Sequence, residues 1–177
     1  STLLKVLLSQ IKPTDGKILI GTKIRISYFD QMRSSLNDEL SVIDNLSEGR
    51  DYIQVGNTKQ HIISYLQDFL FTPKISRTPV KALSGGEKNR LLLAKVFAKQ
   101  ANLLILDEPT NDLDIETLEL LEERLQTFSG TLLLVSHDRS FLNAVITSSF
   151  VFEETGLKEY IGGYDDWLKQ RRTTSEK

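Results

Sequence analysis

The stretch Leu103–Asp114, with the sequence LLILDEPTNDLD, constrains the fold of this chain more than any other segment. Its four consecutive apolar residues, Leu103–Leu106, are typical of a strand that is buried on both faces of a sheet. Asp107 and Glu108 follow at once, and Pro109 ends the strand because proline cannot donate to a sheet ladder. Open α/β sheets bind ligands at the carboxyl ends of their strands. The two acids therefore predict a site that holds a metal ion and activates water, as in proteins that hydrolyse nucleoside triphosphates.

The composition excludes several classes of protein. Hydrophobic residues make up 40% of the 177 residues, which is enough for the core of one large domain or of a domain with a subdomain. The net charge of -2 gives no global basic surface for nucleic acid. The chain has no cysteine and two histidines, which argues against thiolate and histidine-rich metal sites. No apolar run approaches the roughly 18 residues of a membrane span, and no signal peptide opens the chain, so we expect a cytoplasmic protein.

Strands and helices alternate along the sequence, which predicts an α/β fold with a parallel sheet. We expect strands at residues 17–20, 24–29, 103–106 and 131–135, helices at 84–99 and 114–128, a short helix after Asp138, a hairpin of strands at 150–152 and 158–161, and a last helix from Trp167. The pattern between Asn37 and Phe71 is helical and predicts a helical subdomain. The residues at helical spacing behind a predicted cap at Thr58 are Ile62, Leu66, Phe69 and Leu70. The predicted parts are a partial core at 1–36, the helical subdomain with its linker at 37–82, the remaining core at 83–163 and a linker helix at 164–177.

A second informative motif is Leu83-Ser84-Gly85-Gly86-Glu87. Ser84 and Glu87 fit a capping box at the start of a helix. Two glycines in the first turn cost about 1 kcal/mol each relative to alanine, so we expect another group to approach this backbone closely. Bare N–H groups at a helix N-terminus, together with a serine hydroxyl, bind phosphate. On this motif alone, phosphate binding and plain helix capping both remain open.

Taken in order, LSGGE, LLILDEPTNDLD and LLLVSHD make the chain resemble the nucleotide-binding domain of ATP-binding-cassette (ABC) ATPases. The resemblance covers nearly the whole chain. It implies the P-loop NTPase core of that family, a parallel sheet flanked by helices, with a small antiparallel β part and a helical subdomain. The matching motifs are the signature Leu83–Glu87, Walker B at Leu103–Asp107 with the catalytic Glu108, the D-loop Asn111–Asp114, the switch histidine His137 and the Q-loop glutamine Gln31.

The resemblance implies ATP and Mg²⁺ as cofactors and gives each motif a role. Asp107 is implied to hold Mg²⁺ through a water, which suits an ion that prefers one or two carboxylates plus phosphate oxygens. Glu108 is implied to polarise the attacking water, and His137 to contact the γ-phosphate. Gln31 is implied to sense Mg²⁺ and the water and to link them to the helical subdomain. His61 has no such context, and we interpret it as a structural or surface residue.

The first residues match the end of a nucleotide-binding motif. In the family, a sequence like STLLK follows a G-x-x-x-x-G-K loop, so Ser1 is implied to bind Mg²⁺ and Thr2 to lie over the α-phosphate. The loop itself, the strand before it and an adenine-stacking aromatic residue do not occur in this sequence. We expect them upstream of Ser1 in a longer protein, and we expect the 177 residues alone to bind ATP weakly or not at all.

The signature motif implies a partner. In the family, LSGGE of one cassette closes on the ATP held by another, head to tail, so Ser84, Gly85 and Gly86 are implied to serve the nucleotide of a second cassette. Asp114 of the D-loop is also implied to contact nucleotide. Because one ATP then lies between two domains, pairing depends on ATP, and hydrolysis releases it.

Smaller details resemble one branch of the family. EPTNDLD, SHDRSFL and YIGGY resemble ABC-F, whose members carry two cassettes in one chain and no membrane domains. Within ABC-F the chain looks closest to the second cassette of the bacterial Uup proteins, in which a positively charged coiled coil follows. Lys169, Arg171 and Arg172 are either the start of that extension or a solvated helix end.

The branch implies ATP-driven work on ribosomes and RNA, or on DNA, through regions outside this chain. Two alternatives stay open on the sequence. The chain is also compatible with the ATPase subunit of a membrane transporter and with a non-hydrolysing interaction domain.

Overall fold

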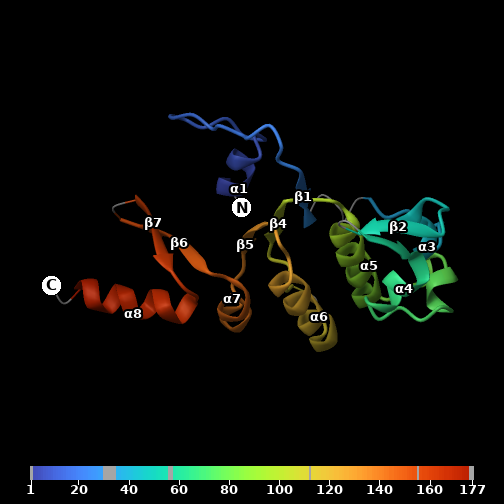
Figure 1. Cartoon of the computed structure of the whole chain (residues 1–177). Helices are drawn as coiled ribbons and strands as arrows, with labels where there is room; N and C mark the ends of the chain where they lie inside the picture. Colours follow the sequence, from blue (N-terminus) through green and yellow to red (C-terminus); the bar gives the residue numbers. More distant parts are fainter. Residues whose placement is uncertain (1, 30–34, 56–57, 112, 155, 176–177) are drawn as a thin grey trace. The chain divides into compact units, whose positions relative to one another are not determined.

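The computed structural model describes residues 2–29, 35–55, 58–111, 113–154 and 156–175, which form two compact units. The first unit spans residues 1–107 and 129–135, and the second spans residues 108–128 and 136–177. The first contains α1 (Thr2–Leu7), β1 (Ile26–Tyr28), α3 (Val42–Ser47), β2 (Tyr52–Val55), β3 (Thr58–His61), α4 (Ile62–Gln67), the 3₁₀ helices η1 (Ile75–Arg77) and η2 (Val80–Ala82), α5 (Gly85–Ala98), β4 (Leu103–Asp107) and β5 (Thr131–Val135) (Figure 1). The second contains α6 (Ile115–Gln126), α7 (Arg139–Val145), β6 (Ser148–Glu153), β7 (Gly156–Ile161) and α8 (Tyr164–Ser175).

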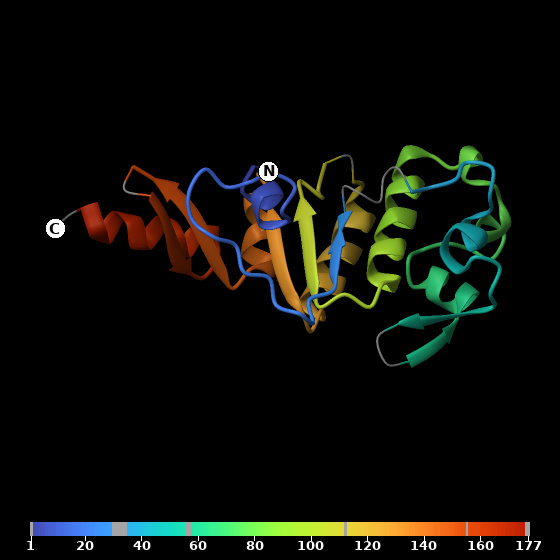
Figure 2. The ribbon, with the colours of Figure 1, turned by 90° about the horizontal axis from the view of Figure 1, so that it is seen from above.

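A parallel sheet in the order β1-β4-β5 confirms the predicted α/β class. In the central strand β4, Leu104, Ile105 and Leu106 are at most 1% exposed, as expected for an apolar run with a strand on each side. Helix α1 covers one face of the sheet, where Leu4 packs with Tyr28 and Ile105 (Figure 2). The apolar stretch identified in the sequence therefore forms the buried central strand of this sheet.

Helices α3, α4 and α5 gather with the β2–β3 hairpin in the same unit (Figure 1). Tyr65, Leu66 and Phe69 are at most 2% exposed and form the apolar interior of this group. The hydroxyl of Tyr65 donates a hydrogen bond of 2.8 Å to the carbonyl of Ala94, which joins α4 to α5. Helix α5, the longest of the group, is thus supported from the side by buried aromatic residues.

A hairpin interrupts the stretch between residues 37 and 71, for which the sequence predicts a helical pattern. Strand β2 pairs antiparallel with β3 across four residues of each strand. Thr58 is consequently a strand residue, and the prediction that it caps a helix is wrong. His61 caps α4 instead, because its Nδ1 atom accepts from the backbone N–H of Ile63 at 3.2 Å. Its predicted structural role is confirmed, although at a strand end rather than within a helix.

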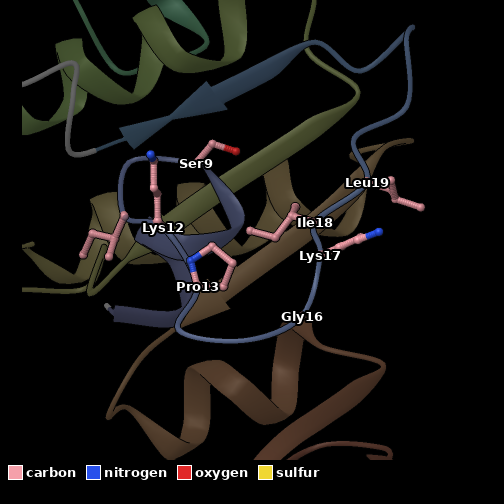
Figure 3. Close-up of a pocket in the computed structure, with 8 residues that line it drawn as sticks. Ser9, Lys12, Pro13, Gly16, Lys17, Ile18 and Leu19 are labelled. Atoms are coloured by element: carbon pink, nitrogen blue, oxygen red, sulfur yellow. The ribbon is translucent and has the colours of Figure 1, made fainter.

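The strand predicted at residues 17–20 does not form either. Leu19 is 93% exposed, and residues 16–19 border an open hollow of about 440 Å³ (Figure 3). A strand needs a hydrogen-bonded neighbour, and none of the strands in the described residues pairs with this segment. The hollow is lined by Ser9, Ile11, Lys12, Pro13, Gly16, Lys17, Ile18 and Leu19. Since none of the predicted site residues is among them, we do not regard it as the functional site.

In the second unit, α6 packs against α7, and the β6–β7 hairpin packs against α8. Leu121 and Leu125 of α6 and Phe141 of α7 are at most 5% exposed and belong to the buried apolar residues of this unit. The predicted hairpin and last helix are present, and α8 begins at Tyr164, the first residue of the predicted part at 164–177 and three residues before Trp167.

Two glycines let β7 turn closely into α8. A Cβ atom at Gly162 would lie 2.5 Å from Oδ2 of Asp166, and one at Gly163 would lie 2.6 Å from Oδ1 of Asn143. Gly162 also has a φ of +101°, which L residues with side chains rarely adopt. The Gly-Gly pair of the YIGGY sequence therefore has a packing role inside this unit.

Candidate functional site

Asp107 is the last residue of β4 and lies opposite Val135 at the end of β5. Its side chain is half-buried, and its Oδ1 atom is inaccessible to solvent without a hydrogen-bond partner among the described residues. A buried carboxylate oxygen is costly unless a donor or a cation satisfies it. Asp107 therefore fits the predicted role as a Mg²⁺ ligand.

The surroundings of Asp107 also indicate what else such an ion would need. No cluster of three or more His, Cys, Asp or Glu side chains suited to a metal occurs in the part of the chain that the structure describes. An ion at Asp107 would thus take its remaining ligands from water and from the phosphates of a nucleotide. Mg²⁺ is the common biological ion that is bound in this way.

Glu108 has a backbone conformation that is unusual for its residue type. Its φ is +49°, in the left-handed region, which costs a non-glycine residue about 1 kcal/mol or more. Its Oε2 atom accepts from the backbone N–H of His137 at 3.3 Å. The Nε2 atom of His137 lies 3.3 Å from Oε1, outside hydrogen-bond geometry, and Oε1 has no hydrogen-bond partner in the described residues. The structure thus brings together two residues that are predicted to be catalytic.

The two side chains differ in their access to solvent. The His137 side chain is 95% exposed, whereas that of Glu108 is 23% exposed. His137 is consequently not a core histidine held by internal hydrogen bonds, and its imidazole is available to a ligand. The buried, unsatisfied Oε1 atom of Glu108 suits the binding and polarisation of a water molecule.

Small polar side chains fix the segments on either side of these residues. The hydroxyls of Thr110 and Ser136 lie 3.4 Å apart, and Ser136 also accepts from the backbone N–H of Asp138 at 3.1 Å. Asp138 in turn caps α7 through the backbone N–H of Phe141 at 3.0 Å. Sequence reasoning did not single out Thr110 and Ser136, because their proximity depends on segments that are far apart in the chain.

Asp114 has a structural role in this chain. Its Oδ1 atom accepts from the backbone N–H of Thr117 at 2.7 Å and caps α6. This contact holds the end of the D-loop in place. The predicted contact of Asp114 with nucleotide stays a prediction.

The predicted capping box of the signature motif is present at the start of α5. The Ser84 hydroxyl accepts from the backbone N–H of Glu87 at 3.3 Å, while the Ser84 backbone N–H and hydroxyl donate to Oε2 of Glu87 at 2.8 and 2.9 Å. These hydrogen bonds, led by the one from the Ser84 backbone, lower the pKa of Glu87. The carboxylate is therefore charged at neutral pH and the helix start is fixed.

The capping box alone does not explain why glycine occupies positions 85 and 86. A Cβ atom added at Gly85 would meet no atom within 4 Å, so the packing of this chain does not require glycine there. Ser84 and Gly85 are exposed and Gly86 is half-buried. The backbone N–H groups at this helix end are thus open to a group from outside the chain.

The remaining predicted site residues lie at or beyond the limits of the described structure. Ser1 and Gln31 are outside the described residues. Thr2 is exposed and begins α1. The proposed contacts of these residues with nucleotide and Mg²⁺ therefore rest on the sequence.

Comparison with known proteins decides the family. Residues 1–111 match the family model described as ABC transporter. The chain belongs to this family. A curated relative, the ATP-binding protein Uup of Haemophilus influenzae, is 56% identical to this cassette over 172 residues, which are 97% of the chain and 27% of the relative. The cassette thus spans about a quarter of the length of this relative.

Solved structures confirm the fold of the cassette. An archaeal ribosome recycling factor, solved in complex with a ribosomal stalk protein, superposes with a TM-score of 0.69 at 25% identity, covering 97% of the cassette and 34% of that chain. A dimeric ATP-binding cassette in a post-hydrolysis state, bound to ADP and phosphate, superposes with a TM-score of 0.63 at 17% identity. The superposition covers 90% of the present chain and 79% of that chain. No helix in the described residues of the cassette is long and apolar enough to span a membrane.

Proposed function

We propose that this cassette is the ATP-hydrolysing part of a soluble, cytoplasmic ABC-F type protein. The observation that carries the proposal is the contact of Glu108 with His137, in which Glu108 directly follows Asp107, the last residue of the strand β4, in the sequence. ATP supplies the phosphoanhydride bond, and Mg²⁺ neutralises the phosphate charge. The family membership and the similarity to an ATP-binding protein support this proposal.

In this proposal each side chain does one task. Asp107 would help to hold Mg²⁺ through a water, for which its unsatisfied Oδ1 atom is a suitable acceptor. Glu108 orients and polarises the attacking water through Oε1, while its other oxygen stays fixed by the backbone of His137. The exposed imidazole of His137 contacts the γ-phosphate. Ser1, Thr2 and Gln31 complete the same nucleotide site.

We further propose that the cassette works head to tail with a second cassette. Ser84, Gly85 and Gly86 then contact the nucleotide of the partner, which gives the open backbone at Gly85 a ligand. Asp114 holds the adjoining D-loop. The dimeric form of a structurally similar ATP-binding cassette supports this arrangement.

The work that ATP drives is proposed to concern the ribosome or nucleic acid. The fold shared with a ribosome recycling factor supports this choice. The charge of the cassette itself, -2, indicates that other regions of a longer protein make such contacts.

Glu108→Gln tests the proposal in the full-length protein. An amide fits the same space, and its oxygen can keep the hydrogen bond from the His137 backbone, so the fold is expected to stay intact. The amide is a far weaker base than the carboxylate, so kcat should fall at least about 100-fold. Glu119→Gln, on the exposed side of α6, is the matched control and should retain wild-type activity.

The same variant discriminates between partners. Glu108→Gln with ATP should co-sediment with ribosomes more strongly than the wild-type protein with ADP. Co-purification with an integral membrane protein instead would favour a transporter subunit. ATPase activity of Glu108→Gln within threefold of wild type would contradict the catalytic assignment.

A further inference from the structure

The turn from β7 into α8 lies beside α7, the helix that follows His137 (Figure 1). Residues 162–165 form this turn, here named the GGYD turn after its sequence. Asn143 of α7 contacts the turn through both polar atoms of its amide. Its Oδ1 atom accepts from the backbone N–H of Asp165 at 3.0 Å, and its Nδ2 atom donates to Oδ2 of Asp165 at 3.0 Å. Because two directional hydrogen bonds join the same pair of residues, they fix the orientation of α7 as well as its distance from the turn.

Gly163 brings the backbone of the GGYD turn against the same helix. It is buried, and a Cβ atom there would lie 2.6 Å from Oδ1 and 3.1 Å from Cα of Asn143. The φ of Gly163 lies outside the left-handed region, so its backbone conformation does not by itself require glycine. The contact with α7 is therefore what requires it. The turn and α7 are packed so closely that one added methyl group would separate them.

A second contact lies at the other end of α7. The guanidinium carbon of Arg139, the first residue of α7, lies 4.9 Å from the ring centroid of Tyr164. The ring of Tyr164 in turn meets that of Trp167 edge to face, with centroids 5.3 Å apart. A guanidinium group is attracted to the face of an aromatic ring. Because α7 has only seven residues, contacts at both Arg139 and Asn143 leave it little freedom to tilt or turn.

The position of His137 depends on α7 because little else holds its side chain. The imidazole is 95% exposed, so its backbone, rather than the packing of neighbouring side chains, sets where it lies. The next residue, Asp138, caps α7 by accepting from the backbone N–H of Phe141, and its own N–H donates to the hydroxyl of Ser136. A shift of α7 would therefore carry residues 136–138 with it, including the backbone N–H that His137 donates to Glu108.

We propose that the GGYD turn positions the switch histidine, and that Asn143, Gly163 and Asp165 are positioning residues for ATP hydrolysis. This inference rests on the proposed function, in which the imidazole of His137 contacts the γ-phosphate. The turn holds α7, α7 holds residues 136–138, and these present the imidazole. Because the same turn begins α8, a displacement of α8 reaches His137 through one short helix.

An exchange of hydrogen-bonding partners tests this proposal in the full-length protein. Asn143→Asp loses the amide donor and places a carboxylate against that of Asp165, so the two like charges should push α7 away from the turn. We expect kcat for ATP hydrolysis to fall about three- to tenfold. Adding Asp165→Asn restores both hydrogen bonds, because the side chain at position 165 then donates to the one at position 143. The double variant should return to within about twofold of the wild-type kcat.

Two further variants separate contact from charge. Gly163→Ala forces the turn away from Asn143 without changing any charge, and it should lower kcat as Asn143→Asp does. Ala144→Asp is the control, because it adds the same charge at the next, exposed position of α7, and it should keep the wild-type kcat. KM for ATP should stay within about twofold in all variants, because Ser1, Thr2 and Asp107, which are proposed to bind nucleotide and Mg²⁺, are unchanged.

NMR of ring-labelled histidine distinguishes positioning from a general loss of stability. The signal of His137, identified by its absence in His137→Gln, should shift when ATP is added to Glu108→Gln. The shift should be at least halved when Asn143→Asp is also present.

Three results would overturn the proposal. If Asn143→Asp and Gly163→Ala keep the wild-type kcat and the His137 shift while Glu108→Gln loses activity, the positioning role is refuted and the proposed function stands. The same conclusion follows if Asn143→Asp lowers kcat and the double variant does not recover it. If the wild-type protein has no ATPase activity at all, both are refuted.

Discussion

The hydrogen bond from Tyr65 to Ala94 gives a quantitative test of how α5 is held. Tyr65→Phe removes the hydroxyl but keeps a ring that is 2% exposed and lies 5.0 Å from that of Phe69. The carbonyl of Ala94, a residue that is 0% exposed, then loses a donor 2.8 Å away. Loss of one buried neutral hydrogen bond costs about 1–1.5 kcal/mol. This corresponds to a roughly tenfold change in the equilibrium for local opening.

Hydrogen exchange of the full-length protein measures this opening locally. Peptides from α5 should exchange about five- to tenfold faster in Tyr65→Phe than in wild type, while peptides from α6, in the other unit, should be unchanged. Tyr52→Phe makes the same chemical change at a side chain that is 49% exposed and should leave α5 unaffected. Exchange of α5 within twofold of wild type, or an increase spread equally over both units, would refute the reasoning.

Three further predictions concern stability, pH and nucleotide. Leu121 is 0% exposed, so Leu121→Ala should lower the free energy of unfolding of its unit by about 2–5 kcal/mol. Urea unfolding can be followed by the fluorescence of Trp167, the one tryptophan of the chain. A loss under about 1 kcal/mol would contradict the burial of Leu121 described above. Because folding lowers the pKa of Glu87, its carboxylate stabilises the start of α5 at pH values above the pKa that this group has in the unfolded chain. This contribution to stability is lost as the pH falls through the pKa that the group has in the folded chain. An NMR titration of its carboxyl carbon should show that pKa below the ordinary value, and Ser84→Ala should raise it part of the way; a curve unaffected by Ser84→Ala would count against the capping box. Calorimetric titration of the 177 residues alone should show weak or no ATP binding, and a micromolar Kd would overturn that expectation.

Local sequence signals predicted those parts of the structure that depend on neighbouring residues. The apolar run Leu103–Leu106 predicted the central strand, because few other structures accept four large apolar residues in a row. Ser84 and Glu87 predicted a capping box, because both partners lie within one helical turn. The adjacent acids after the apolar run predicted a site with Glu108, and the structure shows Glu108 accepting a hydrogen bond from the backbone of His137.

Features that depend on distant partners were missed. The β2–β3 hairpin has a recognisable signal, since Gly-Asn separates two short runs at residues 56–57, but the helical spacing from Ile62 onward is the stronger local pattern. Residues 17–20 look like a strand on composition, yet a strand forms only where a neighbour supplies hydrogen bonds. The contact of Lys95 with Ser35 spans 60 residues, and no local pattern indicates it.

The left-handed backbone at Glu108 has an evolutionary consequence. Selection for stability alone would favour residues that adopt this conformation easily, above all glycine and asparagine. A glutamate persists there only while selection maintains its carboxylate. A relative with glycine or asparagine at this position is therefore expected to keep the cassette fold but to lose ATP hydrolysis. The residue at this one position would then distinguish cassettes that hydrolyse ATP from cassettes that only bind it.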